Sequence, residues 1–302
     1  VIWAPPVGKK LFMVPESIEY ANISTYDFWH AALGHTGQST LRNTMYEDIP
    51  EFPERPAEFH CERCALSKSK HKVPGPASNR ATRKLELIHS DLSGKFPVPS
   101  LEGHNYYITF TDDLTRAVWI YFLSRKSDTF AAIKAFITMA ERQAGTRVLR
   151  LRTDNGGEYT SKELERYLTD QGIVHERTTP YLHESNGMAE RVNQTLATMA
   201  RSMLLDLPLE LWENAYASAV YIKNRLPHAA LKDQTPYEAF RGSKPKILHL
   251  QPFGRECYIH IPEDRRPAGT KLLPRAEKGQ VVGYTDSTQL YKVYIPSRHR
   301  VV

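Results

Sequence analysis

Three acidic residues, Asp91, Asp154 and Glu190, have the types and the spacing needed for metal-dependent phosphoryl transfer, and 35 residues lie between the last two. Mg²⁺ prefers hard oxygen ligands and usually takes one or two carboxylates together with water and substrate phosphate. Two such ions, ~4 Å apart, activate an attacking water or 3′-hydroxyl and stabilise the leaving oxygen. The three acids therefore predict a two-metal site that acts on nucleic acid.

Each of these acids falls in a segment whose pattern predicts a defined position. Asp91 interrupts the apolar run LELIHSDL, where an unpaired charge is costly unless it binds a metal or a partner. Asp154 ends the run VLRLRTD before a Gly-Gly turn, at the sheet edge where open α/β sheets place their sites. Glu190 shares the polar face of an expected helix with Asn186 and Gln194, and the buried face of that helix carries Val192, Leu196, Met199 and Met203.

Other acids near these segments have a simpler interpretation. Asp112 and Asp113 close an expected strand before a turn, and Glu158 follows the Gly-Gly turn. We expect these three side chains to cap turns and to be solvated.

Two histidines and two cysteines precede the acids, as His30-x4-His35 and Cys61-x2-Cys64. These local spacings suit tetrahedral Zn²⁺. Two other interpretations are a redox-active Cys-x-x-Cys pair and histidines that merely fill the core. His60 and His71 flank the cysteines and are rival ligands.

Composition restricts the class of protein. The chain has 302 residues, 41% of them hydrophobic and 25% charged, which is ordinary for a globular protein with two or three domains. A charge of +6 and a pI near 9.1 favour polyanionic partners. Three cysteines argue against a disulfide framework, and we expect Cys257 to be buried. No apolar run is long enough for a membrane span, and the missing initiator Met predicts a piece of a longer polyprotein.

The order of elements predicts a mixed sheet flanked by helices. Three β-rich runs form an antiparallel meander over residues 85–92, 106–113 and 117–123. They are followed by alternating helices and strands, with helices over 127–143, 161–171, 185–204 and 209–226 and strands over 148–152 and 173–178. Residues 62–84 are rich in Lys and Arg and predict a basic linker. Short strands over 256–263, 278–285 and 290–296 predict a small barrel or sheet.

The segments HSDLSG, TDDLTRAVWIYFLSRKSD, LRTDNGGEY and PYLHESNGMAER resemble the core of a copia-type LTR-retrotransposon integrase. The resemblance covers residues 28–302 and implies an RNase H-like catalytic core whose D,D-35-E triad is Asp91, Asp154 and Glu190. One departure is His183-Glu184-Ser185, where the family usually has a Pro-Gln-Gln-like run beside the active site.

The resemblance also implies a division into five parts. They are an N-terminal tail or entry strand (1–20), a helical HHCC zinc domain with its basic linker (21–78), the RNase H-like core (79–228), a connector (229–250) and an SH3-like β-barrel (251–302). In this family the zinc is a single structural ion, and its ligands here would be His30, His35, Cys61 and Cys64. The catalytic ions would be two Mg²⁺ or Mn²⁺.

The resemblance implies two kinds of partner. One is double-stranded DNA, both the cDNA ends of the element and the target DNA, and the other is further copies of the chain. It also implies a location in the nucleus and cytoplasm and not at a membrane. Lys68, Lys70 and Lys72 of the basic linker are expected to contact phosphates, with salt-sensitive affinity. Asn186 and Arg191 at the start of the Glu190 helix are expected to face DNA ends.

Two alternatives stay open at this point. One is a nuclease of the RNase H type, which would cut with water instead of a DNA hydroxyl. The other is a catalytically decayed DNA-binding or assembly protein. The zinc module and the 35-residue gap disfavour the nuclease. The intact triad argues against a decayed protein, but the altered segment 183–185 keeps that alternative open.

Overall fold

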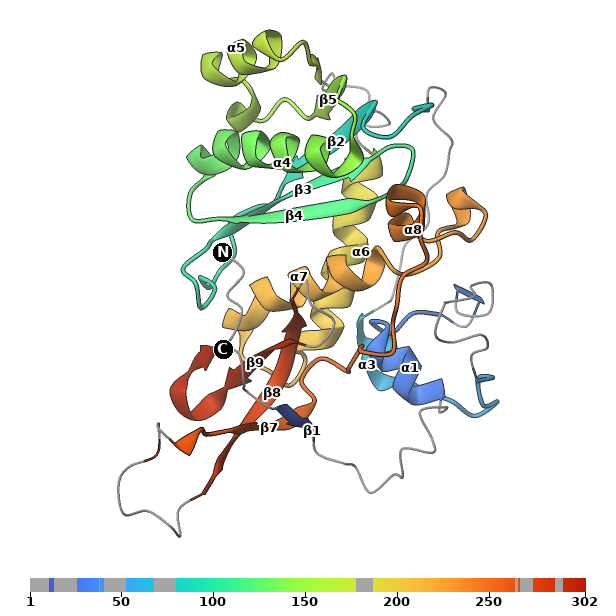
Figure 1. The fold of residues 1–302 in the computed structure, drawn as a ribbon, viewed down its shortest axis with the longest axis vertical. Helices are drawn as coiled ribbons and strands as arrows, with labels where there is room; N and C mark the ends of the chain where they lie inside the picture. Colours follow the sequence, from blue (N-terminus) through green and yellow to red (C-terminus); the bar gives the residue numbers. More distant parts are fainter. Residues whose placement is uncertain are drawn as a thin grey trace.

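The computed structural model describes residues 26–37, 39–40, 53–67, 80–177, 187–263, 266, 274–285 and 290–302, and the backbone of Leu11–Met13. Figure 1 shows a helix-flanked sheet in one half of the molecule and a second, smaller sheet in the other. Across the described residues, no helix combines the length and the apolar character needed to cross a bilayer.

The larger sheet has five strands in the order β4-β3-β2-β5-β6. Antiparallel pairing joins β2 to β3 and β3 to β4, whereas β5 lies parallel to both β2 and β6. The strands are β2 (Leu87–Leu92), β3 (Tyr106–Asp112), β4 (Val118–Leu123), β5 (Arg150–Thr153) and β6 (Val174–Arg177). The predicted mixed sheet is therefore confirmed.

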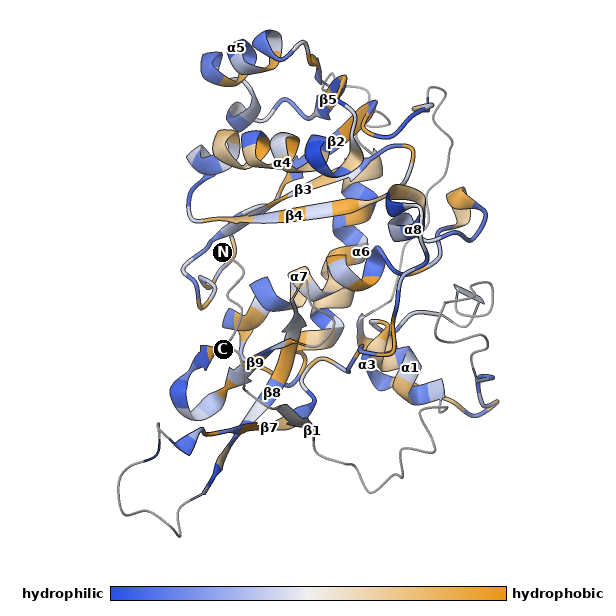
Figure 2. Cartoon of the chain, in the orientation of Figure 1, coloured by the Kyte–Doolittle hydropathy of each residue, from blue (hydrophilic) through white to orange (hydrophobic). Residues whose placement is uncertain are grey.

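Both faces of this sheet are covered, because side chains alternate along β3. Ile108 and Phe110 belong to the core cluster beneath α4 (Thr129–Ala144) and α5 (Lys162–Asp170). Tyr107 belongs to the cluster beneath α6 (Gly187–Leu204) and α7 (Trp212–Lys223). In Figure 2, α4 carries both hydrophobic and hydrophilic positions, as expected for a helix with one buried face.

Two short helices of the N-terminal region pack onto the C-terminal half of α6. They are α1 (Tyr26–Ala32) and α3 (Glu62–Ser67). Trp29 of α1 is buried in the cluster of α6 and α7, and Ser67 Oγ of α3 lies 2.6 Å from Ser202 Oγ of α6. The prediction of a linker over 62–84 is thus wrong for its first residues, because α3 is an ordered helix docked on α6.

The segment after α7 is more than a polar connector. It contains α8 (Pro236–Arg241), whose N-cap Thr235 accepts a hydrogen bond from the Glu238 amide, and Phe240 of α8 is buried in the cluster beneath α4. Single 3₁₀ turns occupy Lys126–Asp128, Gly157–Tyr159, Leu209–Leu211, Ala229–Leu231 and Pro296–Arg298.

The smaller sheet has the order β1-β7-β8-β9-β10. It is formed by β1 (Leu11–Met13), β7 (Glu256–His260), β8 (Ala276–Tyr284), β9 (Tyr291–Ile295) and β10 (Arg300–Val301). Pairing of β1 with β7 makes residues 11–13 an entry strand of the C-terminal sheet. Cys257 is fully buried in the core of this sheet, as predicted.

Candidate active site and metal centre

Asp91 lies near the end of β2 and is half-buried. Its Oδ2 accepts a 2.6 Å hydrogen bond from Nδ2 of Asn193, and the Oδ1 of this amide accepts a 3.0 Å hydrogen bond from Thr109 Oγ1. Burial raises the pKa of Asp91 to about 6, the Asn193 hydrogen bond opposes that rise, and the nearby charges of Asp154 and Glu190 add to it. Asp91 therefore lies near enough to both other acids for their charges to act on it.

Asp154 directly follows β5, which runs parallel to β2 and has Arg152 opposite His89. The parallel register carries Asp154 to the sheet edge that Asp91 occupies. Oδ1 of Asp154 accepts a 3.0 Å hydrogen bond from the Gly156 amide, so the Gly-Gly turn holds the carboxylate as predicted.

A buried tyrosine lies beside this edge of the sheet. Tyr159 is fully buried, and its hydroxyl lies 3.1 Å from Ser90 Oγ of β2. Burial raises the pKa of Tyr159 well above its usual value, and the nearby Asp91 and Asp154 carboxylates add to that rise. Tyr159 therefore stays a neutral hydroxyl that ties the turn after Asp154 to the strand that carries Asp91.

Glu190 lies exposed on the first turns of α6, while Val192, Leu196 and Met199 anchor the opposite face of the helix. Among the described residues, the three acids do not form a cluster tight enough for one ion, whereas the zinc residues do. A two-ion site does not require such a cluster, because each ion needs only one or two carboxylates. The neighbouring Asp154 and Glu190 charges add to the rise in the pKa of Asp91, and a divalent cation stabilises the ionised form of such a carboxylate.

The sequence pattern did not identify Asn193 as a site residue. Asn193 is three residues after Glu190, and its amide points at Asp91 instead of at solvent. A signal was present, because Asn193 is a polar side chain between Val192 and Leu196 on the face of the helix that packs on the sheet. It did not suffice, since the sequence does not show which strand that face meets.

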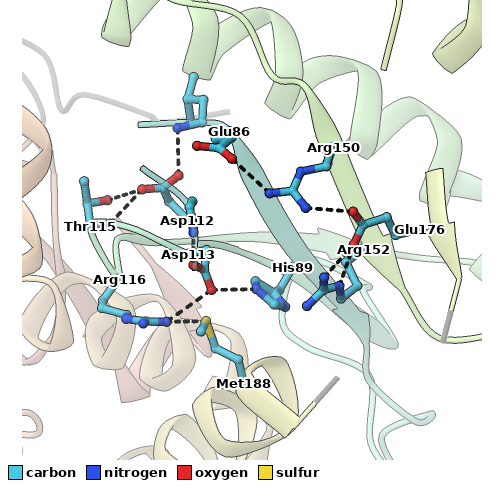
Figure 3. Close-up of polar contacts among 12 residues, drawn as sticks. Glu86, His89, Asp112, Asp113, Thr115, Arg116, Arg150, Arg152, Glu176 and Met188 are labelled. Atoms are coloured by element: carbon cyan, nitrogen blue, oxygen red, sulfur yellow. Dashed lines mark hydrogen bonds and ion pairs between the residues drawn. The ribbon is translucent and has the colours of Figure 1, made fainter. Parts of the chain in front are cut away.

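Asp112 and Asp113 do cap turns, but the prediction that they are solvated is wrong. Both are almost fully buried. Asp112 accepts hydrogen bonds from the Leu85 amide and from the amide and hydroxyl of Thr115. Figure 3 shows the Asp113 carboxylate between the imidazole of His89, at 3.1 Å, and the guanidinium of Arg116, at 3.5 Å.

Glu158 is the third acid that we expected to be solvated. Its side chain is only 13% exposed and lies 4.0 Å from Lys126 Nζ. The Glu158 carboxylate also lies so close to Gly156 that a Cβ there would clash with it. The prediction of solvation is therefore wrong for Glu158 as well.

The four predicted zinc ligands come together although 25 residues lie between the His pair and the Cys pair. Their donor atoms all lie within 4.8 Å of one another. His30 Nε2 is 3.2 Å from Cys64 Sγ, and His35 Nδ1 is 3.2 Å from Cys61 Sγ. Tetrahedral Zn²⁺ with bonds of about 2.0–2.3 Å places neighbouring donors only slightly farther apart.

The surroundings of this cluster fit zinc better than a redox pair. Nδ1 of His30 lies 2.8 Å from the Thr36 carbonyl oxygen and must donate to it, so Nε2 presents a lone pair to the cysteines. His60 is exposed and outside the cluster, and His71 lies outside the described residues. Four protein ligands leave no open coordination position, which fits a structural ion.

Most of the predicted DNA contacts lie in segments that the structure does not describe. Lys68, Lys70, Lys72 and Asn186 fall there, as does the divergent segment His183-Glu184-Ser185. Arg191 is exposed on α6 directly after Glu190.

Comparison with known families agrees with this geometry. Residues 81–183, which include Asp91 and Asp154, match the integrase core domain. This part of the chain is an integrase core. Residues 255–302 match the retroviral polymerase SH3-like domain. The predicted resemblance and fold class are thereby confirmed.

Relatives of this integrase core are transposon polyproteins. The chain is 33% identical over 278 residues to the retrovirus-related Pol polyprotein from transposon TNT 1-94 of Nicotiana tabacum, covering 91% of this chain and 21% of the relative. It is 32% identical to the Pol polyprotein from transposon RE2 of Arabidopsis thaliana, covering 91% of this chain and 19% of the relative. The chain thus spans about a fifth of the length of these relatives.

Among solved structures, the chain is similar to one from a cryo-EM structure of the simian T-cell lymphotropic virus intasome in complex with PP2A regulatory subunit B56 gamma. The TM-score is 0.44 and the identity 21%, over 78% of this chain and 81% of that chain.

Proposed function

We propose that this protein joins the 3′ ends of a retrotransposon's DNA copy to target DNA by metal-dependent transesterification. The observation that carries this proposal is that Asp91 and Asp154 lie at the same edge of an integrase-core sheet, while Asn193 joins the helix of Glu190 to Asp91. The flanking modules add support, because a His/Cys cluster precedes the core and an SH3-like domain follows it.

The three carboxylates would hold two Mg²⁺ or Mn²⁺ ions, and the donor set fits such ions because all ligands are hard oxygens. When bound, paired ions lower the pKa of an attacking hydroxyl and stabilise the leaving oxygen. The chain's own residues fix the donors. Asn193 and Thr109 orient the carboxylate of Asp91, and the Gly156 amide orients that of Asp154.

His30, His35, Cys61 and Cys64 would hold one structural Zn²⁺. Its role would be to fix α1 to α3, because two ligands come from or follow α1 and the other two lie at α3. Both helices pack on α6, which carries Glu190, so the zinc module would stiffen the helix that presents the third carboxylate.

The proposed setting follows from the same chemistry. DNA ends and target DNA would be the partners, a homo-oligomer would hold two ends at once, and the protein would act in a particle that moves from cytoplasm to nucleus. The relatives support this setting, since they are transposon Pol polyproteins.

A strand-transfer assay with labelled element-end DNA and Mg²⁺ tests the activity. We expect joined product from the unaltered protein, none from Asp154→Asn, and full product from Asp170→Asn, which changes an exposed acid on α5. Cleavage without joining would support a nuclease instead. Absence of any product from the unaltered protein would contradict both activities and favour a DNA-binding or assembly role.

A further inference from the structure

A cluster of cationic side chains lies where α7 ends against the β3–β4 turn. Asn224, the residue after α7, makes two hydrogen bonds to the backbone of Val118, of 2.9 Å to its N–H and 2.8 Å to its carbonyl oxygen. This clamp fixes Lys223, the last residue of α7, beside the turn that carries Arg116. The position of the Lys223 backbone is therefore set by the fold.

Lys223 is a buried cation. It is only 9% exposed, and no described acidic side chain forms an ion pair or hydrogen bond with its ammonium group. Burial and the nearby Arg116 lower the pKa of Lys223 to about 8. The C-terminus of α7 favours a cation, but this effect is smaller than the cost of burying an unpaired charge.

Arg116 increases the excess of positive charge. It is 7% exposed and has a left-handed backbone conformation, φ 60°, that is unusual for a side chain of this size. Its guanidinium contacts Met188 Sδ at 2.8 Å and Asp113 at 3.5 Å (Figure 3). Asp113 is shared, because it also accepts hydrogen bonds from His89 and from the Ala81 amide.

His228 supplies a neutral donor to the same cluster. Its Nδ1 accepts a 3.2 Å hydrogen bond from the Ala230 amide, so the ring hydrogen resides on Nε2. Burial, followed by the charges of Lys223, Arg116 and Arg80, lowers the pKa of His228 to about 4. At neutral pH His228 therefore offers an N–H donor and no charge.

The cluster lies next to the candidate active site. Met188, which Arg116 contacts, is two residues before Glu190 on the first turn of α6. Arg191, on the same turn, and Arg80 add positive charge around Arg116. The acids that face Arg116 are Asp112 and Asp113. Burial raises the pKa of Asp112.

We propose that Lys223 and His228, in the positive field of Arg116, form a phosphate-binding pocket beside the first turn of α6. An ammonium group and an imidazole N–H both donate to phosphate oxygens, and the bound dianion or phosphodiester neutralises the unpaired charge of Lys223. The ligand that we assign is a backbone phosphate of DNA next to the reacting one, which rests on the proposed function. Free phosphate or pyrophosphate offers the same oxygens.

Fluorescence anisotropy of a labelled DNA duplex at several salt concentrations tests the pocket. We expect Lys223→Gln to weaken DNA binding about tenfold and to reduce the slope of log affinity against log salt by about 0.9, because one phosphate contact is lost. The matched control is Lys134→Gln. Lys134 is exposed on α4, on the opposite face of the sheet from α6, and its loss should change neither quantity.

The Tm in pyrophosphate, compared with the Tm in sodium chloride of equal ionic strength, shows whether the pocket binds free pyrophosphate as well as the DNA backbone. A rise in Tm with pyrophosphate for the unaltered protein but not for Lys223→Gln supports the pocket. This holds even if the protein fails to bind DNA, and that result would contradict only the proposed function. Loss of DNA affinity without a pyrophosphate effect supports a pocket that takes only backbone phosphate.

Two outcomes would overturn the pocket. One is that Lys223→Gln matches Lys134→Gln in DNA affinity and salt slope while pyrophosphate leaves the Tm unchanged. The other is that Lys223→Gln and Lys223→Met both fail to fold, which would assign the ammonium group to stability. Removal of an unpaired buried charge should instead maintain or raise the Tm.

Discussion

The side-chain amide of Asn193 donates a 2.6 Å hydrogen bond to Oδ2 of Asp91, which links α6 directly to β2. Thr109 of β3 donates to the other end of the same amide, so the orientation of Asn193 is determined. Because Glu190 is three residues earlier on α6, this one contact sets the helix that carries the third acid against the strand that carries the first.

Asn193→Ala should reduce metal-dependent activity about tenfold or more. The hydrogen bond lowers the pKa of Asp91, so its loss raises that pKa further and weakens metal binding. Titration of Mg²⁺ in the strand-transfer assay checks this, and higher Mg²⁺ should restore part of the activity. Thr109→Val, which keeps the shape but loses the donor to the amide, should have a smaller effect in the same direction. Unchanged Mg²⁺ dependence in both variants would contradict a positioning role for Asn193.

The raised pKa of Asp91 predicts a pH dependence of stability in magnesium-free buffer. The pKa of Asp91 rises from 3.8 to about 6 on folding. Its favourable contribution to the free energy of unfolding is therefore fully present below pH 3.8 and is lost as the pH rises through 6. Asp91→Asn should therefore stabilise the protein at pH 7.5, on the order of 2 kcal/mol, with the gain vanishing toward pH 4. Urea unfolding at both pH values measures it. Asp170→Asn is the control, and an equal gain at both pH values would refute the assignment.

Removal of zinc should open the N-terminal module and leave the larger sheet folded. Trp29 is 2% exposed in the cluster shared with α6 and α7, so a chelator should shift its fluorescence to the red. The sheet should keep its far-ultraviolet circular dichroism, because the cluster beneath α4 contains no residue of α1 or α3. Cys64→Ser should reproduce the shift and Trp29→Phe should abolish it. Loss of the sheet signal at the same chelator concentration would show that the two parts unfold as one.

Asp113→Asn should destabilise the protein by about 2–4 kcal/mol. The variant leaves the buried guanidinium of Arg116 without its anion and weakens the hydrogen bond to His89. The free energy of unfolding in urea measures the loss. Glu263→Gln is a suitable control, since Glu263 is 91% exposed and its pairing with Arg266 contributes little. A loss no larger than that of the control would mean that the Asp113 network is not structural.

Much of the fold could be predicted because short patterns report burial within one element. The spacing of Phe130, Ile133, Ile137 and Ala140 predicted one face of α4. Ile133, Ile137 and Ala140 are buried, and Phe130 is partly buried. The alternation of apolar residues predicted the strands that carry or precede Asp91 and Asp154. The spacings of the His and Cys pairs predicted a cluster that the structure brings together.

Burial of single charges could not be predicted in this way. Asp113 follows a strand and looks like an ordinary solvated turn residue, but Arg116 and His89 enclose it. Lys223 ends an apolar helix and looks like a favourable C-terminal cation, but the clamp between Asn224 and Val118 draws it inside. Each outcome depends on a neighbour that is distant in the sequence.

The sequence by itself determined which residues are the candidates for chemistry: the three acids, the four zinc-ligand candidates and the elements on which they lie. Only the tertiary structure decided what holds them, namely the amide of Asn193 on Asp91 and the docking of α3 on α6. It also decided the pairing of Leu11 with Ile259 across most of the chain. The physical reason is that periodicity records which side of an element is buried, whereas its partner is chosen by packing and hydrogen bonding between elements that no local pattern connects.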